Sequence, residues 1–151
     1  MLLLFVGLLA GHLDAKADIN KVLDTWHLAA AKADEETYFG HLSDDSIFLG
    51  TDATERWDKT AFRKFAHPHF AKGKAWTFEA TRRGVQLSKD GKLAWFDEDL
   101  KTQGLGPCRG SGVLRLDDGA WKIVHYNLTL TIPNERLAEV KKLLESAKSG
   151  K

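Results

Sequence analysis

The side chains best suited to chemistry stand together at Glu55, Arg56 and Trp57, just after the apolar run 47–49 and a Gly-Thr-Asp turn. A helix is predicted to follow, and Asp58 alone can cap it. Capping therefore does not explain an acid, a base and an indole at this point. A carboxylate held between apolar walls has a raised pKa and can move a proton. Glu55 is thus a candidate general base, with Trp57 as a wall of the same pocket.

Further candidates lie on strand-like segments of the second half. In segment 120–133, strict alternation puts Trp121, His125 and Asn127 on one face, which we assign to the interior because Lys122 then points outward. Segment 92–102 carries an acid on each face, of which only one can be deep, and Asp97 is the candidate.

Segment 108–117 separates its polar residues from its glycines. Alternation puts Arg109 and Ser111 on one face and Cys108, Gly110 and Gly112 on the other. Two glycines spaced by one residue in a strand indicate a bend or the close approach of another group.

Two interpretations of these residues stay open. In the first, all the candidates surround one cavity. The candidate catalytic residues are Glu55, Asp97 and His125, and the candidate pocket-lining residues are Trp57, Trp76, Arg109, Trp121 and Asn127. In the second, Trp57 fills the core and Glu55 pairs with Arg109 or Arg56, because buried charges persist only when they are paired and hydrogen-bonded.

The sequence predicts no cofactor and no metal. His67-Pro68-His69 could join His125 or His41 at a metal, but no acid stands at a characteristic spacing, which favours a helix stop with two histidines. The glycine-rich stretch 104–112 lacks the Gly-Lys-Ser ending of a phosphate loop and is predicted to be a turn.

Composition predicts one globular domain. The chain has 151 residues, with 22 basic and 21 acidic side chains, so no net charge favours a polyanion and nucleic acid is not an expected partner. The single cysteine, Cys108, excludes an intrachain disulfide framework.

Residues 1–17 differ from the rest of the chain. Eleven apolar or glycine residues precede a polar break and Ala15-Lys16-Ala17, which fits a signal-peptide cleavage site, and the run is too short to span a membrane. The favoured interpretation is a signal peptide, a domain over 18–151 and a periplasmic or secreted location. No lysine or arginine precedes the apolar run. Either the true start lies upstream of Met1, or the segment is an apolar helix that packs on the domain, which would then be cytoplasmic.

The expected elements give an α+β fold. Helices are expected over 18–34, 35–43 and 59–67, capped by Asp18, Asp34 and Asp58, with Pro68 ending the third. Strands are expected over 46–51, 75–88, 92–102, 108–117 and 120–133, and a last helix follows an Asn134 cap. The later strands form an antiparallel meander that curls around the helices.

These elements and their residues resemble a known family. The residues that carry the resemblance are Trp26 with the alanines after it, segment 34–57, "FAHPHFAKGKAW", "AWFDEDL", "RGSGVL" and "WKIVHYNLTLTIPNE". Over about residues 18–140, the chain resembles the SnoaL-like branch of the nuclear transport factor two superfamily, which includes ketosteroid isomerases and polyketide cyclases.

The resemblance implies a cone-shaped curved sheet, a deep pocket between its concave face and the helices, and a dimer formed through its outer face. Ketosteroid isomerases use an aspartate base and an oxyanion hole of a tyrosine and an acid. Neither Tyr38 nor Tyr126 matches that tyrosine by motif, so no catalytic residue is transferred.

Two functions follow, and whether the chain is an enzyme stays open. The first is a small-molecule-binding protein that holds an apolar or aromatic compound against Trp57, Trp76, Trp95 and Trp121, with or without cofactor-independent isomerase, lyase or cyclase activity. The second is a dimerisation or assembly module with a filled cavity, whose outer face carries Val124, Tyr126, Leu128 and Leu130.

Overall fold

The computed structural model describes residues 2–149, and the side chains of residues 14–146. Its helices are α1 (Leu2–Ala31), α2 (Glu35–Gly40), α3 (Lys59–Phe70), the 3-10 helix η1 (Asn134–Arg136) and α4 (Leu137–Ser149). Its strands are β1 (Leu42–Leu49), β2 (Arg56–Asp58), β3 (Phe78–Leu87), β4 (Leu93–Thr102), β5 (Cys108–Asp117) and β6 (Ala120–Leu130). No helix within the described residues is long and apolar enough to cross a membrane.

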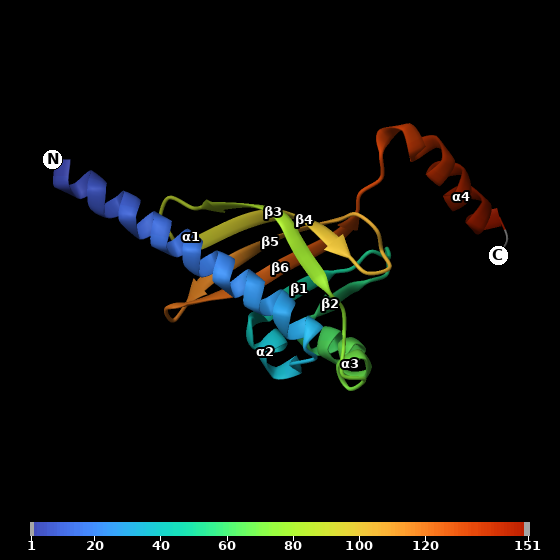
Figure 1. Ribbon diagram of the computed structural model, residues 1–151, viewed down its shortest axis with the longest axis horizontal. Coiled ribbons are helices and arrows are strands. Elements are labelled where there is room, and N and C mark those ends of the chain that lie inside the picture. Colours follow the sequence, from blue (N-terminus) through green and yellow to red (C-terminus); the bar gives the residue numbers. More distant parts are fainter. Residues whose placement is uncertain (1, 150–151) are drawn as a thin grey trace.

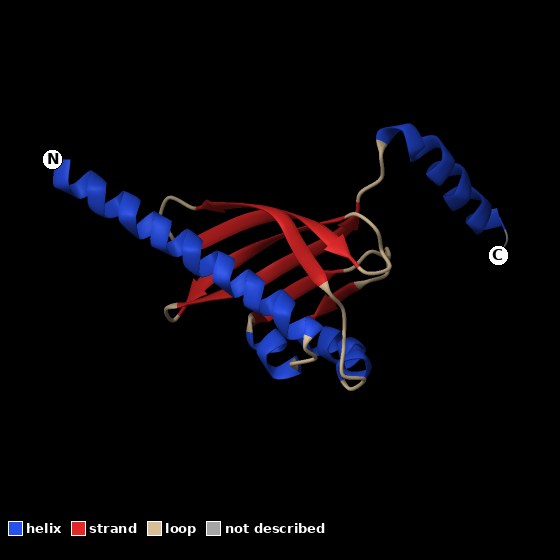
Figure 2. Cartoon of the chain, in the orientation of Figure 1, coloured by secondary structure: helices blue, strands red, loops and turns tan. Residues whose placement is uncertain are grey.

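The strands form one curved, open sheet in the order β2-β1-β6-β5-β4-β3. All neighbours are antiparallel except β1 and β6, which run parallel. Helix α1 crosses the concave face, with α2 and α3 beside its end (Figures 1 and 2). This is the expected α+β architecture, with the predicted meander over β3 to β6.

Local signals account for two helix starts and fail for others. Asp34 accepts from Thr37 N at 3.0 Å and Asp58 accepts from Ala61 N at 2.8 Å, so both predicted caps are confirmed. The Asp18 cap is wrong, because Asp18 lies inside α1. The last helix has no side-chain cap at Asn134, since a 3-10 turn begins there instead.

Pro68 lies within α3, two residues before its end, so its predicted role as a helix stop is wrong. A proline costs a helix the hydrogen bond of its missing N–H. This cost falls in an exposed last turn, where Ala71 N closes the helix by donating to His67 O at 2.9 Å.

A bulge in β6 decides which side chains face the helices. Val113 pairs with His125, but the next β5 residue, Leu114, pairs with Ile123, so Val124 is an extra residue. Ile123 and Tyr126 therefore both point inward and are fully buried. Strict alternation would have placed them on opposite faces.

Aromatic rings fill the space between the helices and the sheet. Trp26 of α1 stacks on Tyr38 of α2 at a centroid distance of 5.0 Å and meets Tyr126 edge-on at 4.7 Å. Phe48 of β1 stacks on Phe62 of α3 at 4.0 Å. Burial of each such side chain contributes about 1.5–3 kcal/mol, and this packing fixes α1, α2 and α3 against the sheet.

The two terminal helices differ in their packing. Ala17 and Asp18, where signal-peptide cleavage is predicted, lie within the continuous helix α1. The signal peptide stays a prediction. Helix α4 stands away from the sheet (Figure 1), and its Leu137, Leu143 and Leu144 are 50%, 68% and 62% exposed.

Candidate functional site

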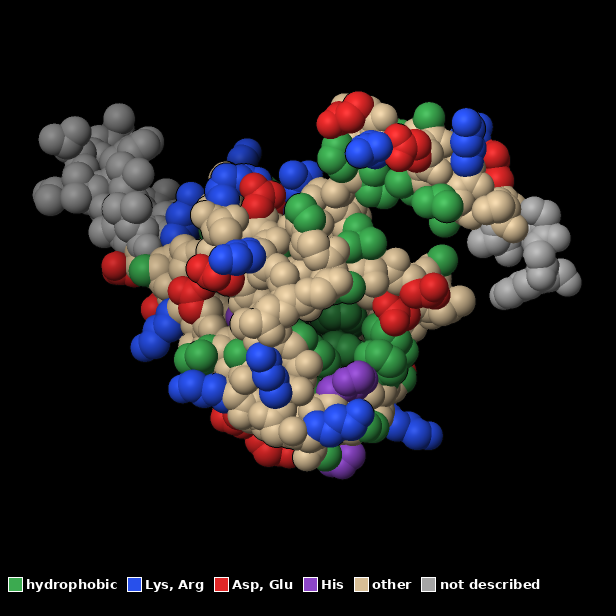
Figure 3. Space-filling view, turned by 45° about the vertical axis from the view of Figure 1, so that its right-hand side comes forward, with side chains coloured by type: hydrophobic (Ala, Val, Ile, Leu, Met, Phe, Trp, Pro, Cys, Tyr) green, Lys and Arg blue, Asp and Glu red, His purple; other side chains and the backbone are tan. Residues whose placement is uncertain are grey.

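An aromatic cavity of about 340 Å³ opens at one end of the concave face, between the sheet and α3. In the space-filling view, hydrophobic side chains gather in a hollow with histidine at its edge (Figure 3). We call this space the aromatic cavity; its lining residues are Phe48, Gly50, Thr51, Glu55, Trp57, Phe62, Phe65, His69, Ala75, Trp76, Phe78, Gln103, Leu105 and Leu128.

The short strand β2 carries Trp57 into the wall of this cavity. Trp57 pairs with Phe48 of β1, so both side chains share the concave face. The Trp57 ring stacks on Phe65 at 4.6 Å and on Phe62 at 5.5 Å. Trp76 forms another wall, and its ring meets the ring of the buried Tyr38 edge-on at 5.4 Å.

A tight loop holds Glu55 at the edge of the cavity. Gly50 N donates to Glu55 O at 2.9 Å, and Glu55 Oε2 accepts from Asp52 N at 3.1 Å. A Cβ on Gly50 would overlap the Glu55 carboxylate, so a larger residue at position 50 would displace that carboxylate from its present position. The loop therefore fixes a half-buried carboxylate beside the aromatic walls.

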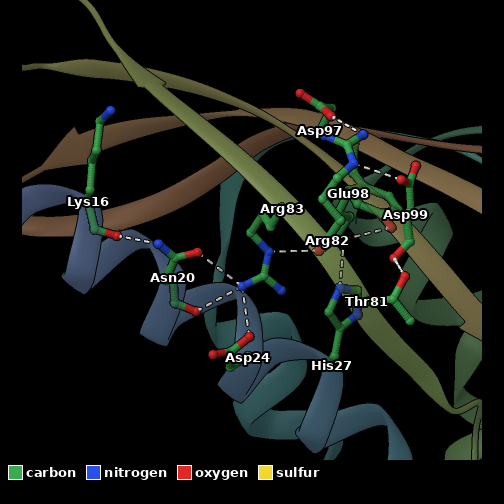
Figure 4. A network of polar contacts seen from close by, with 11 residues as sticks. Lys16, Asn20, Asp24, His27, Thr81, Arg82, Arg83, Asp97, Glu98 and Asp99 are labelled. Atoms are coloured by element: carbon green, nitrogen blue, oxygen red, sulfur yellow. Dashed lines mark hydrogen bonds and ion pairs between the residues drawn. The ribbon is translucent and has the colours of Figure 1, made fainter.

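A second constellation, the buried carboxylate cluster, lies deeper on the same face and comprises His27, Arg83, Glu98 and Tyr126, with the exposed Asp24 at its edge. Glu98 Oε1 is 2.7 Å from His27 Nε2, and Glu98 Oε2 accepts from Arg83 Nε at 2.9 Å. Tyr126 Oη donates to Glu98 Oε1 at 3.3 Å. Figure 4 shows Arg83 reaching from β3 between Glu98 and Asp24, whose carboxylate is 2.7 Å from Nη1.

The cluster holds its central carboxylate in the ionised form. Burial alone would raise the pKa of Glu98, but the contacts with His27 and Arg83 outweigh it and hold that pKa below the usual value. An ionised carboxylate can only accept hydrogen bonds, so His27 carries a proton on Nε2. Burial, followed by the nearby Glu98 charge, raises the pKa of Tyr126 well above its usual value.

Two cavity residues separate the cluster from the aromatic cavity. Phe78 lines the cavity and meets the His27 ring edge-on at 6.1 Å. Leu128 also lines it and pairs with Gly110, which in turn pairs with Glu98. Glu98 is fully buried and His27 is 5% exposed. The cluster is thus sealed, and proton transfer within the cavity would fall to Glu55 or His69.

The structure brings three predicted site residues together at the aromatic cavity: Glu55, Trp57 and Trp76. The predicted pairing of Glu55 with Arg56 or Arg109 is wrong, because Arg109 lies 3.3 Å from Asp99 and Glu55 forms no ion pair among the described side chains. Trp121 does face inward and is buried. It pairs with Leu116 and is not among the residues that line the cavity.

Four predicted site residues lie on the outer face of the sheet instead. His125 and Asn127 were assigned inward by alternation, but the Val124 bulge turns them outward, where they pair with Val113 and Ser111. Asp97 pairs with Ser111 and Arg109 with Asp99, so these side chains share that outer face. Trp95 also lies there and is 51% exposed.

The outer acids form exposed ion pairs. Arg82 lies 3.0 Å from Asp97 and 2.8 Å from Asp99. Such exposed pairs contribute only about 0–1 kcal/mol. The one deep acid on β4 is Glu98, which sequence reasoning missed.

The neighbours of Glu98 carried a signal that could have found it. Phe96 and Leu100, two residues away on either side, share its face and are apolar, whereas Asp97 shares its face with Asp99. His27 directly follows the core residue Trp26, and its distance of four residues from Leu23 places it on the buried helix stripe. Only the packing of α1 on the sheet pairs His27 with Glu98.

Comparison with known proteins identifies the fold. A family model described as the SnoaL-like domain matches residues 19–133. No curated protein matches the sequence. The three solved structures described next are 11% to 16% identical to this chain, and likeness at that level shows the fold alone.

Three solved structures show which proteins share this fold. An NTF2-like protein of unknown function from Pseudomonas putida is 16% identical with a TM-score of 0.69, covering 82% of this chain and 91% of its own. A protein of unknown function from Mycobacterium tuberculosis is 16% identical with a TM-score of 0.72, covering 86% and 79%. A proposed dehydratase of the NTF2-like family from Streptomyces avermitilis is 11% identical with a TM-score of 0.64, covering 80% and 98%.

Proposed function

Because the chain belongs to the SnoaL-like domain family, we propose that it binds a small apolar or aromatic molecule in the aromatic cavity. One observation carries the proposal: six aromatic side chains and few polar groups surround an open space. These six are Phe48, Trp57, Phe62, Phe65, Trp76 and Phe78.

Size and polarity both suit a ligand. Ligand pockets range over about 300–1,000 Å³ and combine apolar walls with a few polar groups, so the volume of about 340 Å³ fits a small compound. Glu55, Thr51, His69 and Gln103 supply the polar groups. If the bound compound is also transformed, Glu55 is the carboxylate placed to accept its proton, in a cofactor-independent isomerase, lyase or cyclase reaction.

Native mass spectrometry of the protein purified from its own host tests binding. We expect a small organic mass that is released by mild denaturation and absent from Trp57→Ala. A chain without any bound mass, and without uptake of added aromatic compounds, would contradict the proposal. The same spectra report the N-terminus, so a mass that begins near Asp18 would support export and an intact Met1 would contradict it.

The outer face supports a second function, homodimerisation. The assembly surface predicted from Val124, Tyr126, Leu128 and Leu130 is wrong in part, because Tyr126 and Leu128 are buried in the core. Exposed Trp95 and Leu93, 51% and 42% exposed, supply apolar area there instead. We expect a dimer in analytical ultracentrifugation and a folded monomer for Trp95→Glu; a monomeric unaltered chain would exclude this function.

A further inference from the structure

We propose that the ligand of the aromatic cavity is an organic cation, an apolar or aromatic amine with a quaternary or protonated nitrogen. This inference rests on the proposed function, ligand binding in the same cavity, and adds the charge of the ligand. It follows from the charge and the ring composition of the walls.

The walls are rich in aromatic rings. The face of an aromatic ring carries negative potential and attracts a cation within roughly 6 Å of the ring centroid, most strongly for tryptophan. Trp57 and Trp76 both line the cavity. In a space of about 340 Å³, a ligand nitrogen cannot lie far from these walls.

Apart from the titratable His69, the only ionisable side chain among the lining residues is an acid. Glu55 is the one acid of the lining, which contains no lysine or arginine. The loop fixes Glu55 through Oε2, which accepts from Asp52 N at 3.1 Å, while Oε1 accepts no hydrogen bond from the described residues. One carboxylate oxygen is therefore held in position and available to a cationic donor or counter-charge.

The same carboxylate selects against acids. An anionic ligand would approach Glu55 in an environment of low polarity, where repulsion is stronger than in water. One positive charge contacts a lining residue from outside the lining: Lys74 Nζ donates to Gln103 Oε1 at 3.1 Å. Lys74 is exposed, so solvent screens its charge. The balance of fixed charge in the cavity thus favours a cation.

Two isosteric probes separate charge from shape. Phenyltrimethylammonium and tert-butylbenzene differ by a nitrogen cation in place of a carbon, and phenylacetate serves as the anion. With the unaltered chain, titrations followed by tryptophan fluorescence should show the cation binding about tenfold tighter than tert-butylbenzene, as cation–π and carboxylate contacts predict, and phenylacetate binding weakest.

Variants then show which residues cause the preference for the cationic probe. Glu55→Gln keeps an acceptor for Asp52 N and should reduce affinity for the cation about fivefold to tenfold, with tert-butylbenzene unchanged. Lys74→Gln, the control, should leave tert-butylbenzene unchanged and tighten the cation by about twofold or less. Trp95→Phe removes the exposed outer indole and should alter neither affinity.

The outcomes distinguish the inference from the function on which it rests. Equal binding of the cation and tert-butylbenzene, or tighter binding of tert-butylbenzene or phenylacetate, would overturn the cation assignment and leave ligand binding intact. Failure of all three probes to bind the unaltered chain would overturn both. The probe comparison uses the unaltered chain and does not depend on whether Glu55→Gln folds.

Discussion

The buried carboxylate cluster and the aromatic cavity occupy one concave face but use it in opposite ways. The cluster collects charges and pairs each with another, with Glu98 fully excluded from water. The cavity collects uncharged rings, keeps open space and holds its one carboxylate at the edge. Buried charges demand complete pairing, so the charged region is closed, while the region of rings can remain open to a ligand.

Glycine contributes to the difference. At Gly110 of β5, a Cβ would overlap the Tyr126 hydroxyl and lie 2.9 Å from Glu98 Oε1. Atoms of the cluster therefore fill the space that a side chain at position 110 would take. In the aromatic cavity, by contrast, the volume enclosed by the walls is not filled by protein atoms.

The largest expected effect comes from breaking the cluster. Glu98→Ala leaves Arg83 and His27 buried without their shared partner, and such a loss costs about 3–5 kcal/mol in the free energy of unfolding. Asp97→Ala on the outer face of the same strand removes only an exposed pair and should cost about 0–1 kcal/mol. Urea denaturation measures both, and equal losses would show that the cluster is not a structural unit.

Overlap at Gly110 should produce the next effect. Gly110→Ala forces Tyr126 or Glu98 to shift and should destabilise the fold by about 1–3 kcal/mol. Gly40→Ala is the control, because a Cβ there meets no atom within 4 Å. Its unfolding free energy should change by at most about 0.5 kcal/mol. A Gly110→Ala variant as stable as the Gly40→Ala variant would mean that the cluster tolerates rearrangement.

The aromatic cavity should respond mainly in binding. Trp57→Ala removes a half-buried ring from the wall, so its stability should fall less than that of Glu98→Ala, by about 1–2 kcal/mol. Its affinity for phenyltrimethylammonium should fall at least about fivefold. Thermal unfolding and fluorescence titration measure the two effects, and unchanged affinity would place the ligand elsewhere.

The sequence was sufficient for the fold and for part of the cavity. Apolar periodicity, the Asp34 and Asp58 caps and the turn signals are local, and they predicted the order of most elements. Glu55 and Trp57 were selected because helix capping left them unexplained, and both reach the cavity.

The errors arose where tertiary packing overrides local pattern. No glycine or proline marks the bulge at Val124, yet that one extra residue moves His125 and Asn127 to the outer face. His27 and Glu98 are separated by 71 residues, so their contact exists only once α1 packs on the sheet. Alternation showed that one acid of β4 is deep but did not select Glu98.

The smallest effect concerns acid stability. The pKa of Glu98 is lower in the folded chain than its ordinary value, so the unfolded chain binds a proton more readily as the pH falls. The contribution of Glu98 to stability is thus present above about pH 4.3, the ordinary glutamate pKa, and is lost as the pH falls through the folded-state pKa.

In Glu98→Gln this contribution is absent at every pH. The unaltered chain should therefore lose more unfolding free energy than Glu98→Gln between about pH 6 and pH 3, because only the carboxylate titrates. Surface carboxylates such as Asp99, whose pKa is also lowered, chiefly by Arg82, contribute equally to both proteins and cancel. If the unfolding free energies of the two proteins changed in parallel with pH, Glu98 would not be preferentially ionised in the folded chain. The closed region would then lack the buried charge that distinguishes it from the open, apolar cavity.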